Sequence, residues 1–265
     1  MDTKSLGFRT DLMVRQMAGS EIEYRDGYVV VRTIRNPGFW WGNFILVRGE
    51  LLDSDPDAWQ GIFRSEFPSS EHLAIGLDTE QPPGDSIRTY LDELGLSLEV
   101  SAVMVSSRLI PPRPHSTDIE LRQLSSESDW SQLLEMRSRL EDGEEHFGPT
   151  YGEFQRLYCD ETREMNERFL EWTFGAFLGH RLLGSVGIAV ESDGLARFQN
   201  VLTATESRRT GIASNLVFHV GRFAESELDA TRLVMVADPT GPAIGIYRQL
   251  GFVDSEVQVM LQKGV

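Results

Sequence analysis

A single cysteine and the lack of any long apolar run set the first limits on this chain. Cys159 has no partner for an internal disulfide, which is typical of a reducing compartment. No apolar stretch approaches the ~18 residues of a membrane-spanning helix, and residues 1–13 lack the apolar core of a signal peptide. We therefore expect a soluble, cytoplasmic protein without a membrane partner, in which Cys159 is a packed core residue.

Positive charge is also scarce, since 25 lysines and arginines stand against 41 aspartates and glutamates, a net charge of −16. Nucleic-acid binding depends on contacts to phosphates, so this balance argues against a nucleic-acid partner. The negative charge would attract an amine ligand, although it also serves solubility alone. With 40% hydrophobic residues among 265, the chain can form one large core or two modest ones.

Three prolines in residues 109–116 (LIPPRPHS) favour an extended spacer, because proline fits poorly inside regular elements. We predict an N-terminal domain at residues 1–110, a linker at 111–116 and a second domain at 117–265. The N-terminal domain is expected to hold strands at 27–33, 39–47, 72–78 and 96–106, the first two forming a hairpin. Asp53, Asp55 and Asp57 are interpreted as caps of a helix over Trp59–Phe67 rather than as a Ca²⁺ loop.

The second domain is predicted to contain both strands and helices. Apolar periodicity predicts strands at 119–124, 172–178, 181–190, 195–203 and 233–237, and helices at about 129–140 and at 153–169. Two further helices are expected, one with the apolar positions Ile212, Leu216, Val220 and Phe223, and one after Thr240 that holds Ala243 and Tyr247. The polar segment 141–151 separates the first two helices. This pattern predicts an α/β fold with a mixed, mostly antiparallel central sheet flanked by helices.

The turn between the strand ending at Thr203 and the next helix is the feature that points to chemistry. It reads Arg208-Arg209-Thr210-Gly211-Ile212-Ala213-Ser214. The first N–H groups of a helix have no partner within the helix, and the helix dipole favours negative charge there. Gly211 admits close backbone approach, and the two arginines supply charge-assisted donors. We expect this turn to bind a diphosphate.

Two motifs resemble the signatures of the GNAT acetyltransferase superfamily. Arg208-x-x-Gly211-x-Ala213 is similar to its (Q/R)-x-x-G-x-(G/A) turn. The later residues Ala243, Tyr247, Gly251 and Phe252 match A-x-x-x-Y-x-x-x-G-F, although Thr240 stands where the family usually has Asn. Both lie in the expected order on the expected elements, and the resemblance covers about the last 145 residues.

The N-terminal domain contains a weaker echo of the same pattern. One series in the N-terminal domain runs Leu73–Asp78, Tyr90, Leu94–Leu96 and Glu99-Val100. Similar residues follow in the same order in the second domain, as Leu233–Asp238, Tyr247, Leu250–Phe252 and Glu256-Val257. We interpret the N-terminal domain as a smaller, degenerate GNAT-like half. Its link after Val47 (RGELLDSDPD) is acidic and would repel a diphosphate.

The resemblance implies an N-acetyltransferase that moves an acetyl group from acetyl-coenzyme A directly to a primary amine of a small molecule or a protein. The backbone of Val201, Leu202 and Thr203 would pair with the pantetheine arm, and the turn Arg208, Arg209, Thr210, Gly211, Ile212, Ala213 and Ser214 would hold the diphosphate. A strand N–H near Val201 would stabilise the oxyanion, and Tyr247 would donate a proton to the leaving thiolate. A homodimer remains an open alternative.

The base is not apparent from the sequence. The strand Leu195–Thr203 carries no carboxylate or histidine, which leaves a water relay past Gln199 or Asn200, a carboxylate of Glu141–Glu145, or His146. A module that senses acyl-coenzyme A without turnover stays open for this reason. An acyltransferase with a longer acyl donor is a second alternative, which the resemblance implies because some tandem GNAT-like proteins use such donors. His72, His180 and His219 have no ligands at metal spacing, so no metal is expected.

Overall fold

The structure is a computed structural model that describes residues 3–49, 52, 55–114, 116, 118–140 and 151–263. It divides into two compact units. The first holds residues 1–103, 236–239 and 255–265, and the second holds 104–235 and 240–254. The domain limits of 1–110 and 117–265 remain a prediction, because compactness does not show which segments fold independently.

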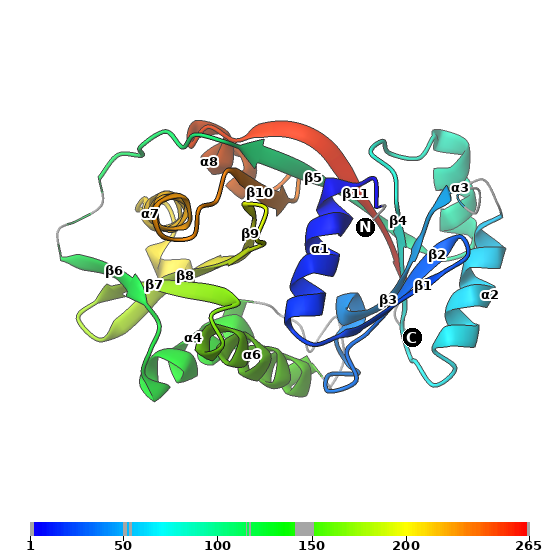
Figure 1. Ribbon diagram of the computed structural model, residues 1–265, viewed down its shortest axis with the longest axis horizontal. Coiled ribbons are helices and arrows are strands. Elements are labelled where there is room, and N and C mark those ends of the chain that lie inside the picture. Colours follow the sequence, from blue (N-terminus) through cyan, green and yellow to red (C-terminus); the bar gives the residue numbers. More distant parts are fainter. Residues whose placement is uncertain are drawn as a thin grey trace. The chain divides into compact units, whose positions relative to one another are not determined.

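The first unit is a sheet with helices packed on it, and its strands follow the order β1-β2-β3-β4-β11, with β5 next to β11. Figure 1 shows α1 on one side of these strands and α2 and α3 on the other. The elements are α1 (Leu6–Met17), β1 (Glu21–Arg25), β2 (Tyr28–Arg32), the 3-10 turn η1 (Trp40–Gly42), β3 (Asn43–Val47), α2 (Pro56–Glu66), β4 (Leu73–Leu77), α3 (Asp85–Glu93), β5 (Ser97–Ser106) and β11 (Val253–Lys263).

The predicted hairpin is confirmed, since β2 pairs with β3 from Tyr28 opposite Val47 to Arg32 opposite Asn43. The predicted strand over 39–47 was too long, because Trp40–Gly42 forms a 3-10 turn. The side-chain amide of Asn43 donates to the carbonyls of Asn36 and Phe39, both at 2.9 Å, and so holds the preceding loop in a turn. The strand β1 was not predicted.

The two longest helices of this unit, α1 and α2, are both capped at their N-termini by side chains of the protein. Ser5 caps α1 and accepts from Phe8 N, while Asp78 accepts from Ser5 N at 2.8 Å. Asp55 caps α2, as the aspartate pattern predicted, although the helix begins at Pro56 rather than Trp59. The hydroxyl of Tyr90 donates to Asp55 at 3.1 Å and to Asp57 at 3.3 Å. Carboxylates therefore occupy the start of α2, where an anion would be repelled.

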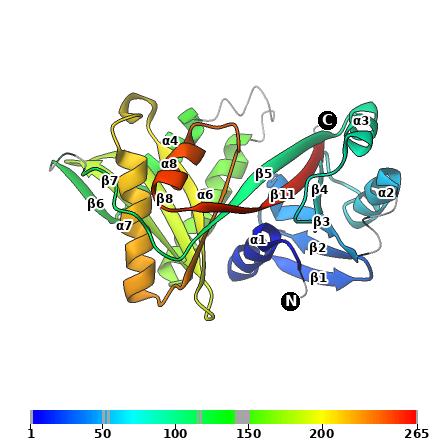
Figure 2. The same cartoon turned by 90° about the horizontal axis from the view of Figure 1, so that it is seen from above.

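The second unit is a strand meander covered on both faces. Its strands follow the order β6-β7-β8-β9-β10, antiparallel except for β9 and β10. Figure 2 shows α7 on one face and α4 and α6 on the other. The elements are β6 (Ile119–Gln123), α4 (Glu127–Leu140), α6 (Tyr151–Glu167), β7 (Glu171–Leu178), β8 (Arg181–Val190), β9 (Leu195–Thr203), the 3-10 turn η3 (Thr205–Ser207), α7 (Ile212–Glu227), β10 (Arg232–Ala237, to Met235 in this unit) and α8 (Ala243–Gln249).

This arrangement confirms the predicted fold class of a mixed, mostly antiparallel sheet flanked by helices. Cys159 belongs to a buried cluster with Trp130, Leu133 and Phe177, which confirms it as a core residue. Burial raises the pKa of its thiol, so the thiolate is disfavoured. Among the residues that the structure describes, no helix combines the length and the hydropathy needed to cross a membrane.

Four strands and one crossover helix follow the same topology in the two units. In the first, β1, β2 and β3 are antiparallel, and β4 runs parallel to β3 after the crossover helix α2. In the second, β7, β8 and β9 are antiparallel, and β10 runs parallel to β9 after α7. This correspondence supports the interpretation of the first unit as a GNAT-like half.

Candidate functional site

The edge of β9 that faces β10 is open over its second half. Pairing between the two strands joins Arg232 to Leu195, Leu233 to Ala196 and Val234 to Arg197, and it extends no further within these two fully described strands. On its other edge β9 stays paired with β8 as far as Thr203. Val201, Leu202 and Thr203, the residues predicted to pair with an extended ligand, therefore lie where one edge of the strand is free of β10.

A β-bulge lies at the start of this open segment. Ser185 of β8 pairs with Leu202 and Gly187 with Gln199, so that Val186 alone faces two residues, Asn200 and Val201. Asn200 has a φ of 50°, in the left-handed region that asparagine tolerates better than most residues. A bulge leaves its extra residue outside the ladder and re-aims backbone groups. The N–H groups around Val201 are thus set apart from the regular β8–β9 pairing.

The turn from η3 to α7 presents a row of backbone donors. Among the described residues, nothing accepts a hydrogen bond from the N–H groups of residues 209–214; the first helical bond runs from Asn215 N to Gly211 O. Gly211 is the N-cap, has a φ of 86° that suits glycine, and caps the helix with no side chain. Unlike α1 and α2, the helix α7 begins without a side-chain acceptor, which fits an anion.

Positive charge lies beside these donors. Arg208 and Arg209 are exposed, and neither guanidinium forms an ion pair or hydrogen bond with another described residue. Arg222 further along α7, by contrast, pairs with Glu225. Arg209 has a φ of 63°, and so the turn holds two left-handed residues within three positions. The predicted residues Arg208, Arg209, Thr210, Gly211, Ile212, Ala213 and Ser214 thus form the turn before α7 and the first three positions of that helix.

Tyr247 lies on α8 with 4% of its surface exposed. Its ring meets Phe252 edge-on at a centroid distance of 6.3 Å, and Phe252 meets Phe198 of β9 at 5.9 Å. The Tyr247 hydroxyl makes no hydrogen bond to a described residue. Burial raises the pKa of the phenol to about 12, so it keeps its proton at physiological pH.

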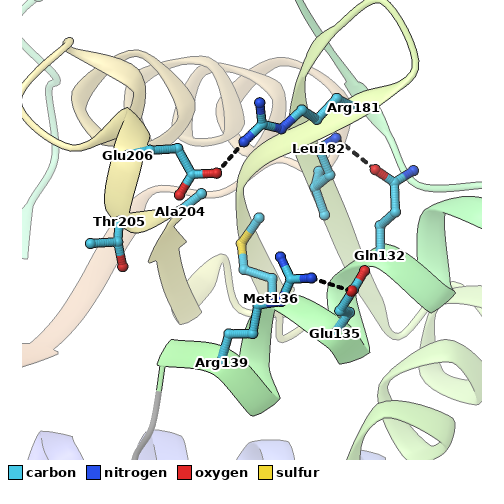
Figure 3. Close-up of a pocket in the computed structure, with 9 residues that line it drawn as sticks. All are labelled: Gln132, Glu135, Met136, Arg139, Arg181, Leu182, Ala204, Thr205 and Glu206. Atoms are coloured by element: carbon cyan, nitrogen blue, oxygen red, sulfur yellow. Dashed lines mark hydrogen bonds and ion pairs between the residues drawn. The ribbon is translucent and has the colours of Figure 1, made fainter.

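A small cavity of about 150 Å³ lies beside the turn that precedes Arg208 (Figure 3). Its charged side chains already form pairs, Arg181 with Glu206 and Arg139 with Glu135. None of the predicted site residues lines it; its walls are Gln132, Glu135, Met136, Arg139, Arg181, Leu182, Ala204, Thr205 and Glu206. We therefore do not place the candidate site in this cavity.

Sequence reasoning missed a buried carboxylate at the start of β7, which lies over Gly187 of the neighbouring strand β8. Glu171 opens β7 with 3% of its surface exposed, on the face that carries α4 and α6. The amide of Asn166 donates to the Thr173 hydroxyl at 2.9 Å, which leaves that hydroxyl's proton for Glu171 at 3.2 Å. A Cβ on Gly187 would collide with this carboxylate and lie 3.4 Å from Cβ of Gln199. The sequence signal for its burial was the alternation of side chains along β7. This alternation places Glu171 on the same face as Thr173.

A second missed residue is Arg137 of α4, with 3% of its surface exposed. It follows Trp130 and Leu133 on the buried stripe of the helix, at spacings of seven and four residues. An arginine on such a stripe was the signal that could have found it. Its guanidinium carbon lies 4.8 Å from the ring centroid of Tyr158 on α6.

The other sequence candidates for the base divide into two groups. Glu141–Glu145 and His146 lie outside the described residues. Gln199 and Asn200 are half-buried on β9, and the Asn200 side-chain amide donates to the Tyr158 hydroxyl at 3.0 Å.

His72 contacts the carbonyl of Asn43 at 3.0 Å, and burial lowers the pKa of its ring. In the part of the chain that the structure describes, no three acidic, histidine or cysteine side chains are grouped to hold a metal.

The part of the chain that holds this site matches a known protein family. The sequence profile of the acetyltransferase (GNAT) family matches residues 133–252, which contain β7 to β9, the α7 turn and Tyr247. No curated protein matches the chain.

Solved structures share the fold over nearly the whole chain. A conserved protein of unknown function from Staphylococcus epidermidis is 16% identical, with a TM-score of 0.73 over 93% of this chain and 95% of its own. A GCN5-related N-acetyltransferase from Kribbella flavida is 13% identical, with a TM-score of 0.66 over 98% and 96%. A tandem GNAT protein from the clavulanic acid biosynthesis pathway is 12% identical, with a TM-score of 0.55 over 92% and 83%. The chain therefore contains a domain of the GNAT acetyltransferase family over residues 133–252, on a fold that solved GNAT proteins share.

Proposed function

We propose that this protein is an N-acetyltransferase that moves an acetyl group from acetyl-coenzyme A to a primary amine by direct transfer. Family membership supports acyl transfer from acyl-coenzyme A in general. The observation that carries the proposal is the run of six N–H groups at residues 209–214, for which no described residue supplies an acceptor, next to two guanidinium groups that pair with no described residue. Backbone donors at an uncapped helix start, with added positive charge, suit a diphosphate.

The residues of this unit have separate tasks in the proposal. Residues 208–214 hold the diphosphate, and the open edge of Val201–Thr203 pairs with the pantetheine arm as an added strand. When bound, acetyl-coenzyme A supplies an activated acyl thioester. The backbone N–H at the β9 bulge, near Val201, stabilises the negative charge that develops on the acyl oxygen.

Two side chains handle protons. The amine must lose a proton to attack, and we assign its acceptor to Glu171, whose carboxylate accepts a hydrogen bond from the Thr173 hydroxyl at 3.2 Å. Tyr247 holds a proton on Oη for the departing sulfur, since its raised pKa keeps the phenol neutral. The missing carboxylate on β9 thus has a substitute on β7.

The test is the release of free thiol from acetyl-coenzyme A over a panel of primary amines. We expect release that depends on the amine and produces the matching N-acetyl amide. Faster release from longer acyl-coenzyme A donors would favour the longer-chain alternative. A sensor, which the lack of a base on β9 favours, would bind the thioester and release no thiol with any amine.

A further inference from the structure

Arg137 is a buried cation that has no acidic partner among the residues that the structure describes. Only 3% of its surface is exposed, and its Nη1 has no hydrogen-bond acceptor. No carboxylate among the described residues lies within ion-pair distance of the guanidinium, whereas the exposed arginines Arg139 and Arg156 and the half-buried Arg163 all have acidic partners. In a chain with a net charge of −16, an unpaired arginine inside the protein is unexpected.

The surroundings of Arg137 lead directly to the bulge on β9. Its guanidinium lies over the ring of Tyr158, 4.8 Å from the centroid. The hydroxyl of the same tyrosine accepts a hydrogen bond of 3.0 Å from the side-chain amide of Asn200. Asn200 is one of the two bulge residues, and the N–H groups beside it are those assigned to the acyl oxygen. One tyrosine therefore separates the buried cation from the proposed reaction centre.

Burying an arginine without an anion is costly, because the guanidinium loses its hydration and gains only the aromatic ring in return. The π face of Tyr158 offsets part of this cost, but Tyr158 accepts no hydrogen bond from Nη1 of Arg137. An unmatched buried donor of this kind is stabilised when a ligand brings the acceptor. Arg137 lies on the side of the sheet that carries α4 and α6. The side chains of Asn200 and Glu171 lie on the same side.

We propose that Arg137 binds a carboxylate of the acceptor, so that the substrate is an amine that also carries a carboxylate, such as an amino acid. The inference rests on the proposed function and names the class of its acceptor. A carboxylate matches the planar guanidinium with two parallel hydrogen bonds and balances its single positive charge. A phosphate dianion would leave one excess negative charge beside this buried guanidinium.

The first experiment compares pairs of acceptors that differ only in the carboxylate, with wild-type protein. Amino acids, beginning with glycine, β-alanine and lysine, are assayed against their carboxamides for thiol release from acetyl-coenzyme A. We expect kcat/KM to favour the free acid of at least one pair by about 30-fold or more, the range for a buried charge pair. Equal values, or a preference for the amide in every pair, would overturn the inference while leaving the acetyltransferase assignment intact.

The second experiment removes the cation with R137Q, and R139Q serves as the matched control on the same helix, where the exposed Arg139 pairs with Glu135. R137Q should lose the preference for the free acid and keep transfer to the amide within a few-fold, and R137K should restore part of the preference. R139Q should behave as wild type. If R137Q still prefers the free acid, the inference fails.

A third measurement works without turnover or a folded variant. N-acetylglycine and its carboxamide are titrated into wild-type protein, and the thermal midpoint is followed. We expect a higher midpoint with the acid only, for this compound or for the N-acetyl derivative of whichever amino acid the first assay selects. The absence of thiol release with every amine would count against the proposed function, and equal midpoints for acid and amide against the carboxylate site.

Discussion

Replacing Tyr247 with phenylalanine is expected to lower kcat about 100-fold and to change the affinity for coenzyme A less than threefold. The substitution keeps the ring that packs on Phe252 and removes a hydroxyl that makes no hydrogen bond to a described residue. Proton donation typically contributes 10²–10⁴-fold, and we expect the low end, because a thiolate leaves readily without full protonation. Steady-state kinetics and calorimetry with coenzyme A separate the two effects.

Tyr90 provides the matched control, since it holds the equivalent position in the first unit. Its hydroxyl donates to Asp55 and Asp57, and desolvation together with these carboxylates raises the pKa of Tyr90 to about 12. Tyr90→Phe should leave kcat unchanged. An unchanged kcat in Tyr247→Phe, or an equal loss in both variants, would remove the proton-donor role from Tyr247.

Replacing Glu171 with glutamine is expected to lower kcat by about 10²–10³-fold at neutral pH. Glutamine keeps the size of the side chain, which fills the space over Gly187, but it cannot accept a proton from the amine. The deficit should shrink as the pH rises, since more of the amine is then already deprotonated. A pH profile of kcat for both proteins measures this trend.

Glu120→Gln is the control for Glu171, because Glu120 is an exposed carboxylate on the strand next to β7. We expect wild-type kinetics from it. A loss in Glu171→Gln that stays constant from acidic to basic pH would show a positioning effect, and no loss at all would return the base to the relay past Gln199.

The conformation of the turn before α7 was predictable from the sequence because local chemistry determines it, whereas the ligand of residues 208–214 stays a prediction. Glycine at a left-handed N-cap, arginines before it and an apolar helix after it are all adjacent in the chain. The hairpin of β2 with β3 and the cap at Asp55 were predictable for the same reason. Each depends on neighbours within a few residues of one another.

Features that depend on distant neighbours were missed. Arg137 is one of two arginines on α4; its place on the apolar stripe hints at burial, but its contact with Tyr158, 21 positions away, is seen only in the structure. Glu171 gains its setting from Asn166, Thr173 and Gly187 together. The edge strand β1 (EIEYR) has little apolar patterning because much of it is exposed, so its sequence gave no strand signal.

Calorimetric titration of coenzyme A tests the central claim most directly. The claim is that the amides of residues 209–214 and the guanidinium groups of Arg208 and Arg209 bind its diphosphate. Wild-type protein should bind coenzyme A, and the double charge reversal R208E/R209E should weaken binding at least 100-fold, because two charge-assisted contacts are lost and repulsion replaces them. R222E, a reversal at an exposed position on the same helix, should bind as wild type. No binding by the wild type, or unchanged binding by R208E/R209E, would contradict the account.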